Sequence, residues 1–244
     1  TSLNKSDEAP FQYGHLSLKD ILAVRDKRLA QTIDTVLLYN GRGFTRFNTG
    51  MESTSSTGYG VAKYDNEAIP EGFRSQSGKN YTHAPLFWLS VIYLNYAEAC
   101  AELGNITQDD LDKSINLLKD RAGLPHLSPI VGFSDPANNH GVSDLIWEIR
   151  RERRCELMFD NDNRYWDLIR WHQLDKLDTT KYPDIILGAN VANDMDGCEA
   201  NKVGKYIDGS KDGSRIYDKK HYLYPIPTGQ IALNPQLAPN NPGW

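Results

Sequence analysis

The segment from Leu145 to Trp171, LIWEIRRERRCELMFDNDNRYWDLIRW, constrains the fold more than any other part of the chain. Its apolar residues recur at helical spacing, which predicts a helix with one buried face. Continuing that spacing places three charged residues on the same face, namely Glu152, Arg153 and Glu156. Charges in a core are costly unless they are paired, and Arg164 and Asp167 follow after a short break. We therefore expect a buried ion-pair network joining two antiparallel helices, the alternative being a solvent-exposed charged face.

This segment resembles the C-terminal signature of the SusD/RagB family of outer-membrane nutrient-binding lipoproteins. The residues that match its first helix are Ile149, Glu152, Arg153, Glu156, Leu157 and Phe159. Those that match its second helix are Arg164, Tyr165, Trp166, Asp167, Leu168, Arg170 and Trp171. Further matches are the YLNYAEA run at 93–99 and a closing signature, Pro225-Ile226-Pro227 to Asn241-Pro242-Gly243. With Arg28-Leu29 and the region at 57–59, the resemblance covers roughly residues 25–244.

The chain departs from that family in two ways. Relatives usually turn between the two signature helices through a Glu-Gly pair, whereas this chain has Asp160-Asn161-Asp162-Asn163. Because Asn tolerates left-handed backbone, we expect it to replace the glycine. Family members also begin with a secretion signal, a lipidated cysteine and a long helical-repeat half, none of which follows Thr1. The resemblance thus implies that residues 1–244 are the family's C-terminal domain, lipid-anchored through a missing N-terminal segment.

Start and stop signals, together with apolar periodicity, predict four helices in two hairpins, at about 86–122 and 142–177. The predicted helices cover Leu86–Leu103, Asp109–Ala122, Val142–Phe159 and Tyr165–Leu177. Thr107 with Asp110 suits a capping box, and Gly123 suits a helix end. The flanking regions, 1–85 and 178–244, are loop-rich. The predicted fold is mainly α, with degenerate tetratricopeptide-like hairpins, extensive loops and little β structure.

Composition and motifs exclude several classes of function. A net charge of −5 argues against nucleic-acid binding, which needs a basic surface. No phosphate-binding glycine loop, metalloprotease helix motif or nucleophile elbow occurs. We therefore predict a protein that is not an enzyme, with no catalytic residues, no cofactor and no metal. Asp194-Met195-Asp196-Gly197 resembles a fragment of a calcium loop without its closing Glu, so a structural Ca²⁺ near Asp194–Asp196 stays open.

Aromatic residues on loops are the best candidates for ligand contacts. A sugar offers flat C–H faces and a rim of hydroxyls, which aromatic rings beside planar hydrogen-bonding side chains can meet. The region between Tyr39 and Tyr81 is rich in both kinds of side chain. The candidate residues are Phe44, Arg46, Phe47, Asn48, Tyr59 and Phe73. The alternative for each aromatic is that it anchors its loop to the core.

The resemblance implies a function without catalysis. Family members bind oligosaccharide or polysaccharide on the outward face of the outer membrane and deliver it to a TonB-dependent transporter. A second class stays open, in which this domain is a protein-interaction scaffold that contacts the transporter and the glycan site lies in the missing half. A third class, a glycoside hydrolase, would need two carboxylates across a cleft, and no recognisable catalytic motif supplies them.

Overall fold

The computed structural model describes residues 25–34, 57, 59–64, 66, 68–74, 78–83, 85–160, 163–190, 202–203, 206–209 and 213–244. The described chain is mainly α-helical, as predicted. Its α-helices are α2 (Lys27–Thr32), α3 (Glu71–Arg74), α4 (Leu89–Glu102), α5 (Gln108–Asp112), α6 (Ile115–Ala122), α7 (Asp144–Glu156), α8 (Asn163–Arg170) and α9 (Thr228–Leu233). The 3-10 helices are η4 (Leu174–Leu177), η5 (Pro183–Ile186), η6 (Lys219–Tyr222) and η7 (Pro235–Leu237).

The β structure consists of short antiparallel strands. Strand β1 (Ile33–Asp34) pairs with β2 (Gly60–Val61), with Ile33 opposite Val61. A second sheet has the order β3-β5-β4 and contains β3 (Leu187–Asn190), β4 (Lys202–Val203) and β5 (Tyr206–Asp208). Both sheets bring distant parts of the chain together, but neither builds the core.

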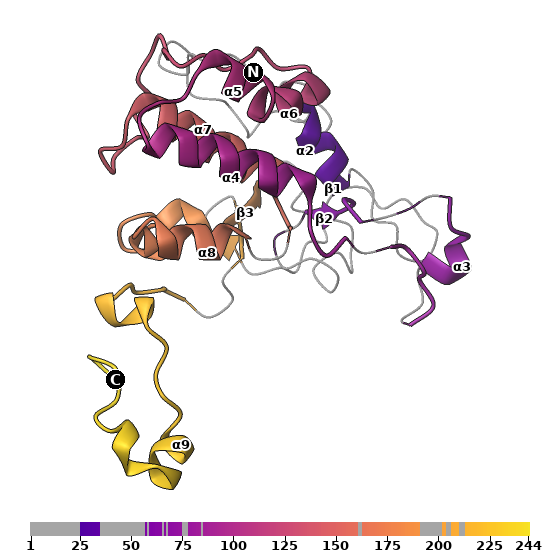
Figure 1. Ribbon diagram of the computed structural model, residues 1–244. Coiled ribbons are helices and arrows are strands. Elements are labelled where there is room, and N and C mark those ends of the chain that lie inside the picture. The colour runs from indigo at the N-terminus through magenta and orange to yellow at the C-terminus, as the bar shows by residue number, and fades with distance from the viewer. Residues whose placement is uncertain are drawn as a thin grey trace.

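Helices α4 to α8 lie close together, and the C-terminal segment extends away from them. Figure 1 shows α4 and α7 side by side, with α5 and α6 against them and α8 beyond. Residues 213–244, drawn in yellow shades, run from the side of α8 away from these helices. Among the described residues, no helix has both the length and the apolar character that crossing a membrane requires.

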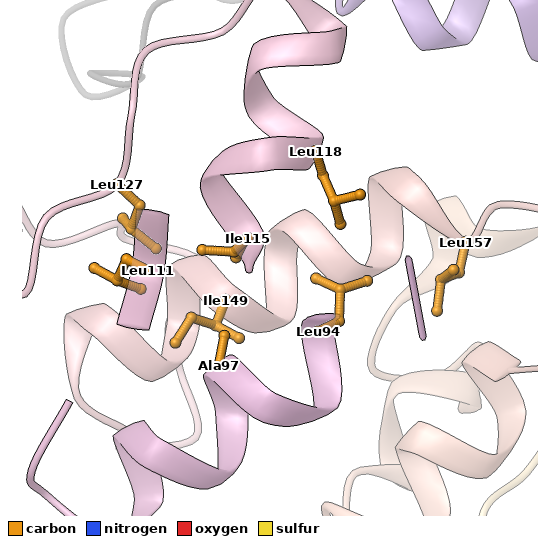
Figure 2. Close-up of a cluster of buried hydrophobic side chains, with 8 residues drawn as sticks. All are labelled: Leu94, Ala97, Leu111, Ile115, Leu118, Leu127, Ile149 and Leu157. Carbon is orange, nitrogen blue, oxygen red and sulfur yellow. The ribbon is translucent and has the colours of Figure 1, made fainter. Parts of the chain in front are cut away.

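The core lies where α4, α5, α6 and α7 meet. Side chains from these helices point toward one another in Figure 2, and most of them are fully buried. The cluster contains Leu94, Ala97, Leu111, Ile115, Leu118, Leu127, Ile149 and Leu157. The periodic apolar stripe of α7, through Ile149, therefore does pack against α4, and this fixes which face of α7 turns inward.

The prediction of one helix over Asp109–Ala122 is wrong, because the helix is interrupted. Its start is confirmed: Thr107 Oγ1 accepts a hydrogen bond from the Asp110 N–H, and the Asp110 carboxylate accepts one from the Thr107 N–H. However, α5 ends at Asp112, and Ser114 leaves the helical region with φ −134° and ψ −99°. The Ser114 hydroxyl donates to the Asp110 carbonyl, an alternative to the helical hydrogen-bond pattern that serine readily offers.

The other helices are shorter than predicted. Helix α4 begins at Leu89, and not at Leu86. Helix α8 ends at Arg170, because His172 adopts a left-handed φ of 53° and the chain then continues as η4. The end of α6 is as predicted: Gly123 has φ 67° and caps the helix.

Candidate functional site

The inward charges of α7 meet partners from far along the chain. Arg28 of α2 donates to Glu152 and, over 2.9 Å, to Glu156 Oε2. It also binds Asp26, while Arg121 of α6 binds the other oxygen of Glu156. Burial works to lower the pKa of Arg28, but hydrogen bonds to Asp26 and Glu152 outweigh it and hold that pKa above its ordinary value. These charged groups are paired with one another. The cluster therefore has a structural role and links α2, α6 and α7.

A second ion pair joins α7 to α8. Arg153 Nε donates to Asp167 Oδ2 over 2.7 Å, and both side chains are about 95% buried, with relative exposures of 6% and 5%. The Nη1 atom of Arg153 also donates to Asn95 Oδ1 over 2.8 Å. By contrast, Arg164 forms no ion pair with any described residue. Desolvation and repulsion from Arg154 lower the pKa of Arg164 to about 10, although Asp167 partly offsets them.

Glu98 of α4 joins α4 to the end of α8. Both of its oxygens accept from Arg170, over 3.0 and 2.6 Å, and Oε1 also accepts from Trp171 Nε1 over 2.6 Å. The Trp171 ring lies 4.6 Å from the guanidinium carbons of both Arg150 and Arg170. Burial would raise the pKa of Glu98, but the bond and charge of Arg170 hold it below its ordinary value.

The end of α7 is held by a loop that precedes α4. Lys63 Nζ binds Asp160 Oδ2 over 2.8 Å, and Tyr64 Oη donates to Asp160 Oδ1 and to the Phe159 carbonyl, both over 2.7 Å. Phe159 itself adopts φ 64°. A left-handed residue in this turn is therefore a phenylalanine. Of the two asparagines of the turn, Asn163 begins α8 and has no left-handed φ, and Asn161 lies outside the described residues.

The predicted ligand residues are only partly described. Tyr59 is half-buried, and Phe73 is 47% exposed and meets Tyr81 edge-on, with ring centres 6.0 Å apart. Neither Tyr59 nor Phe73 lines the cavity described below. The other predicted residues lie outside the described residues: Phe44, Arg46, Phe47 and Asn48.

A cavity of about 270 Å³ lies between Tyr165 in the first turn of α8, η4 and the C-terminal segment. We call it the aromatic cavity. Its lining residues are Tyr165, Leu174, Leu177, Arg215, Ile216, Tyr217, His221, Leu223, Tyr224 and Trp244. Ligand pockets typically measure about 300–1,000 Å³, so this one suits a single ring better than a long oligomer. Two of its aromatic residues are also well exposed, Tyr224 at 63% and Trp244 at 46%.

Several side chains of the aromatic cavity also take part in hydrogen bonds. Tyr224 Oη donates to Tyr165 Oη over 3.1 Å, which joins the C-terminal segment to α8. The Asp218 N–H donates to His221 Nδ1, so the other ring nitrogen of His221 carries the proton in the neutral form. Burial and a hydrogen bond with Tyr222 raise the pKa of Tyr217 to about 12, so its hydroxyl stays protonated near neutral pH.

The closing signature of the sequence positions Trp244. The Asn241 side chain donates to the Tyr224 carbonyl over 2.5 Å, and the Trp244 N–H donates to the Asn241 carbonyl over 3.1 Å. Gly243 has φ 90°, and a Cβ there would lie 2.9 Å from the Cβ of Lys220. Only glycine fits this close approach, which lets the Trp244 ring lie 4.5 Å from Lys220 Nζ.

Sequence reasoning missed the residues that line the aromatic cavity. A signal was present, because Tyr217, His221, Tyr222 and Tyr224 are as dense as the aromatics of the 39–81 region. What the sequence could not reveal was that α8 and η4 would close the other side of the cavity. The possible Ca²⁺ site near Asp194–Asp196 lies outside the described residues. Within the described residues, no cluster of three or more His, Cys, Asp or Glu side chains could hold a metal ion.

The chain was compared with known proteins and families. The model of the SusD family matches residues 22–244, which include every described helix and the aromatic cavity. Comparisons with curated proteins and with solved structures gave no match. Proteins of the matched family bind glycans for nutrient uptake at the cell surface. Because the match extends over nearly the whole sequence, the chain belongs to the SusD family.

Proposed function

We propose that this protein captures oligosaccharides without chemically changing them and delivers them to a TonB-dependent transporter. In this proposal it works on the outward face of the outer membrane, held there by a lipid anchor. The family membership supports glycan binding for nutrient uptake, and the transporter is the partner that such a role requires.

The observation that carries this proposal is the aromatic cavity. A pyranose ring binds well where an aromatic face covers its C–H groups and hydroxyls meet polar atoms at the edge. The exposed rings of Tyr224 and Trp244 supply such faces, and the Tyr165–Tyr224 hydroxyl pair supplies a polar edge. No described Asp or Glu lines the cavity, which favours binding over acid/base hydrolysis.

A second contact area for a longer glycan is the loop region before α4. Its proposed residues are Phe44, Arg46, Phe47, Asn48, Tyr59 and Phe73. Phe73 lies in the short helix α3, and not on a loop as the sequence suggested. It supports this assignment, because its half-exposed ring can contact a ligand.

Calorimetric titration of this chain with a panel of oligosaccharides tests the proposal. We expect at least one glycan to bind with modest affinity, because the open cavity leaves much of the ligand in water. Tyr224→Ala should weaken binding, because it removes the most exposed ring of the cavity. Phe87→Ala is the matched control: that ring is 92% exposed and is not part of the cavity lining. Equal affinities for both variants would place the glycan site elsewhere.

The exposed face of α4 favours a second role, as a scaffold that contacts the transporter. Leu89 and Ile92 are 63% and 58% exposed, and Leu86 and Phe87 just before them are more exposed still. Contiguous apolar surface of this kind often marks a protein contact. Under this alternative, purified transporter binds the chain, Ile92→Asp weakens that complex, and no glycan in the panel binds.

A further inference from the structure

We propose that the aromatic cavity selects an acidic sugar, and that Arg215 binds its anionic group. The inference rests on the proposed function, since it names the class of glycan that the cavity takes. The shared chemistry is a negative group carried on a sugar ring, either the carboxylate of a uronic acid or a sulfate ester.

Arg215 is an exposed cation in the cavity wall, and it has no anionic partner among the described residues. Its backbone is fixed, because its N–H donates to Thr179 Oγ1 over 2.9 Å and its carbonyl accepts from the Thr179 N–H over 2.9 Å. Its guanidinium forms no ion pair or hydrogen bond with any described residue. Arg28, Arg153 and Arg170 differ in this respect, because each is bound to carboxylates. A planar guanidinium whose backbone is held in place, and which has no ion pair with a described residue, can bind a carboxylate or a sulfate through two parallel hydrogen bonds.

Further positive charges lie beside the same cavity. Lys220 Nζ lies 4.5 Å from the Trp244 ring centre, and Lys181 Nζ lies 5.8 Å from that of Tyr217. The nearby carboxylates are already engaged. Asp178 accepts from Thr180 and from the Tyr217 N–H, and Asp218 caps η6.

This concentration of cations contrasts with the whole chain, whose net charge is −5. An anion at the cavity can therefore pair with these cations, although the net charge of the whole chain is negative. An acidic sugar can use both kinds of side chain. Its C–H groups can pack on the aromatic rings, and its anionic group can bind the guanidinium of Arg215. A neutral sugar uses only the first of these.

The test compares three probes by calorimetry at low salt: an oligogalacturonide, its carboxyl-reduced neutral counterpart, and a sulfated neutral oligosaccharide. We expect one or both anionic probes to bind about three- to tenfold more tightly than the neutral one. Which anionic probe binds more tightly distinguishes a carboxylate ligand from a sulfate ligand. Raising the salt concentration to 0.5 M should shrink this preference, because exposed charge pairs are screened.

Arg215→Gln should abolish the preference for the anionic probes, so that this variant binds the anionic and neutral probes with about equal affinity. Lys79→Gln is the matched control, because Lys79 is also an exposed cation but is not among the residues that line the cavity. Circular dichroism of both variants checks that they fold. Equal affinity of the wild-type protein for acidic and neutral probes, or a preference that survives in Arg215→Gln, would overturn the inference while glycan binding itself stands. Absence of binding by all probes and by the wider panel would overturn both proposals.

Discussion

Glu156 shows how a charge on the inward face of a helix becomes structural. It is 7% exposed, and its two oxygens receive Arg28 from α2 and Arg121 from α6. Glu156→Ala would leave Arg28 in a buried position with fewer counter-charges. Breaking a buried ion pair typically costs about 3–5 kcal/mol, so we expect the free energy of unfolding to fall by that order and the melting temperature by about 10 °C. Thermal denaturation followed by circular dichroism measures both changes.

Lys113→Ala is the control for that prediction, because it also removes an ion pair. Lys113 binds Asp109 and Asp110, but its side chain is 50% exposed, so water replaces the lost contacts. We expect a much smaller change in melting temperature than for Glu156→Ala. Equal changes in melting temperature for the two variants would show that the ion pairs of Glu156 do not stabilise the protein more than an exposed ion pair does.

Glu98 makes stability depend on pH. Its pKa is held below 4.5 in the folded protein, because Arg170 binds the ionised form despite burial. A carboxyl group whose pKa falls on folding stabilises the protein fully above its unfolded pKa and loses that contribution as pH drops toward the folded value. We therefore expect the free energy of unfolding to fall as pH decreases below about 4.5.

Denaturant unfolding of the wild-type protein and of Glu98→Gln at several pH values measures the effect of Glu98. The glutamine can still accept from Trp171 but does not titrate. Its stability should be lower at pH 7 and should vary less between pH 5 and pH 3. Parallel curves for the two proteins would mean that Glu98 does not contribute to the acid sensitivity.

At the level of single residues, the sequence predicted both partners of the Arg153–Asp167 ion pair but only one partner of the pairs with Arg28. The helical spacing correctly placed Glu152, Arg153 and Glu156 inward, because the apolar positions around them define the face. The Arg28 partner of Glu152 and Glu156 was less accessible to prediction. Arg28 lies 124 residues from Glu152, and no local pattern specifies a contact over that distance.

The boundaries of the helices were also predicted only in part. Local signals located the capping box at Thr107 and the left-handed cap at Gly123, because both motifs depend only on neighbouring residues. The interruption at Ser114 was missed, since Leu111, Ile115 and Leu118 keep their helical spacing across it. All three are buried on the same core, so periodicity alone could not distinguish one helix from two.

Gly123 supports a prediction about the end of α6. Its φ of 67° is left-handed, and a Cβ there would lie 3.2 Å from Lys27 Nζ. Gly123→Ala should lower the free energy of unfolding by about 1–2 kcal/mol, the usual cost of left-handed backbone for a residue with a Cβ. The matched control is Gly132→Ala, because Gly132 has no left-handed φ and open space around its Cβ position. Chemical denaturation of both variants makes the comparison, and similar losses in both would contradict the cap.

At the scale of the molecule, the candidate ligand cavity depends on contacts between parts of the chain that are far apart in the sequence. The aromatic cavity needs Tyr165 and Leu174 from one part of the chain and residues 215–244 from another. The family signatures explain part of this assembly. Asn95 and Glu98 bind α7 and α8, and Asn241 and Gly243 position Trp244. The sequence therefore identified the residues that build the scaffold, while the cavity between them emerged only from the fold.

The distribution of carboxylates over the whole described chain predicts that the protein does not hydrolyse glycans. Hydrolysis by the usual route needs two carboxyl groups facing each other across the bound sugar, about 5–9.5 Å apart. Most of the buried carboxylates instead lie in ion pairs, such as Glu98 with Arg170, Glu156 with Arg28, and Asp167 with Arg153. Incubation of pure protein with any glycan that it binds should release no reducing ends above a blank. Reproducible release that is lost when a single carboxylate is replaced by its amide would contradict the binding role and establish a hydrolase.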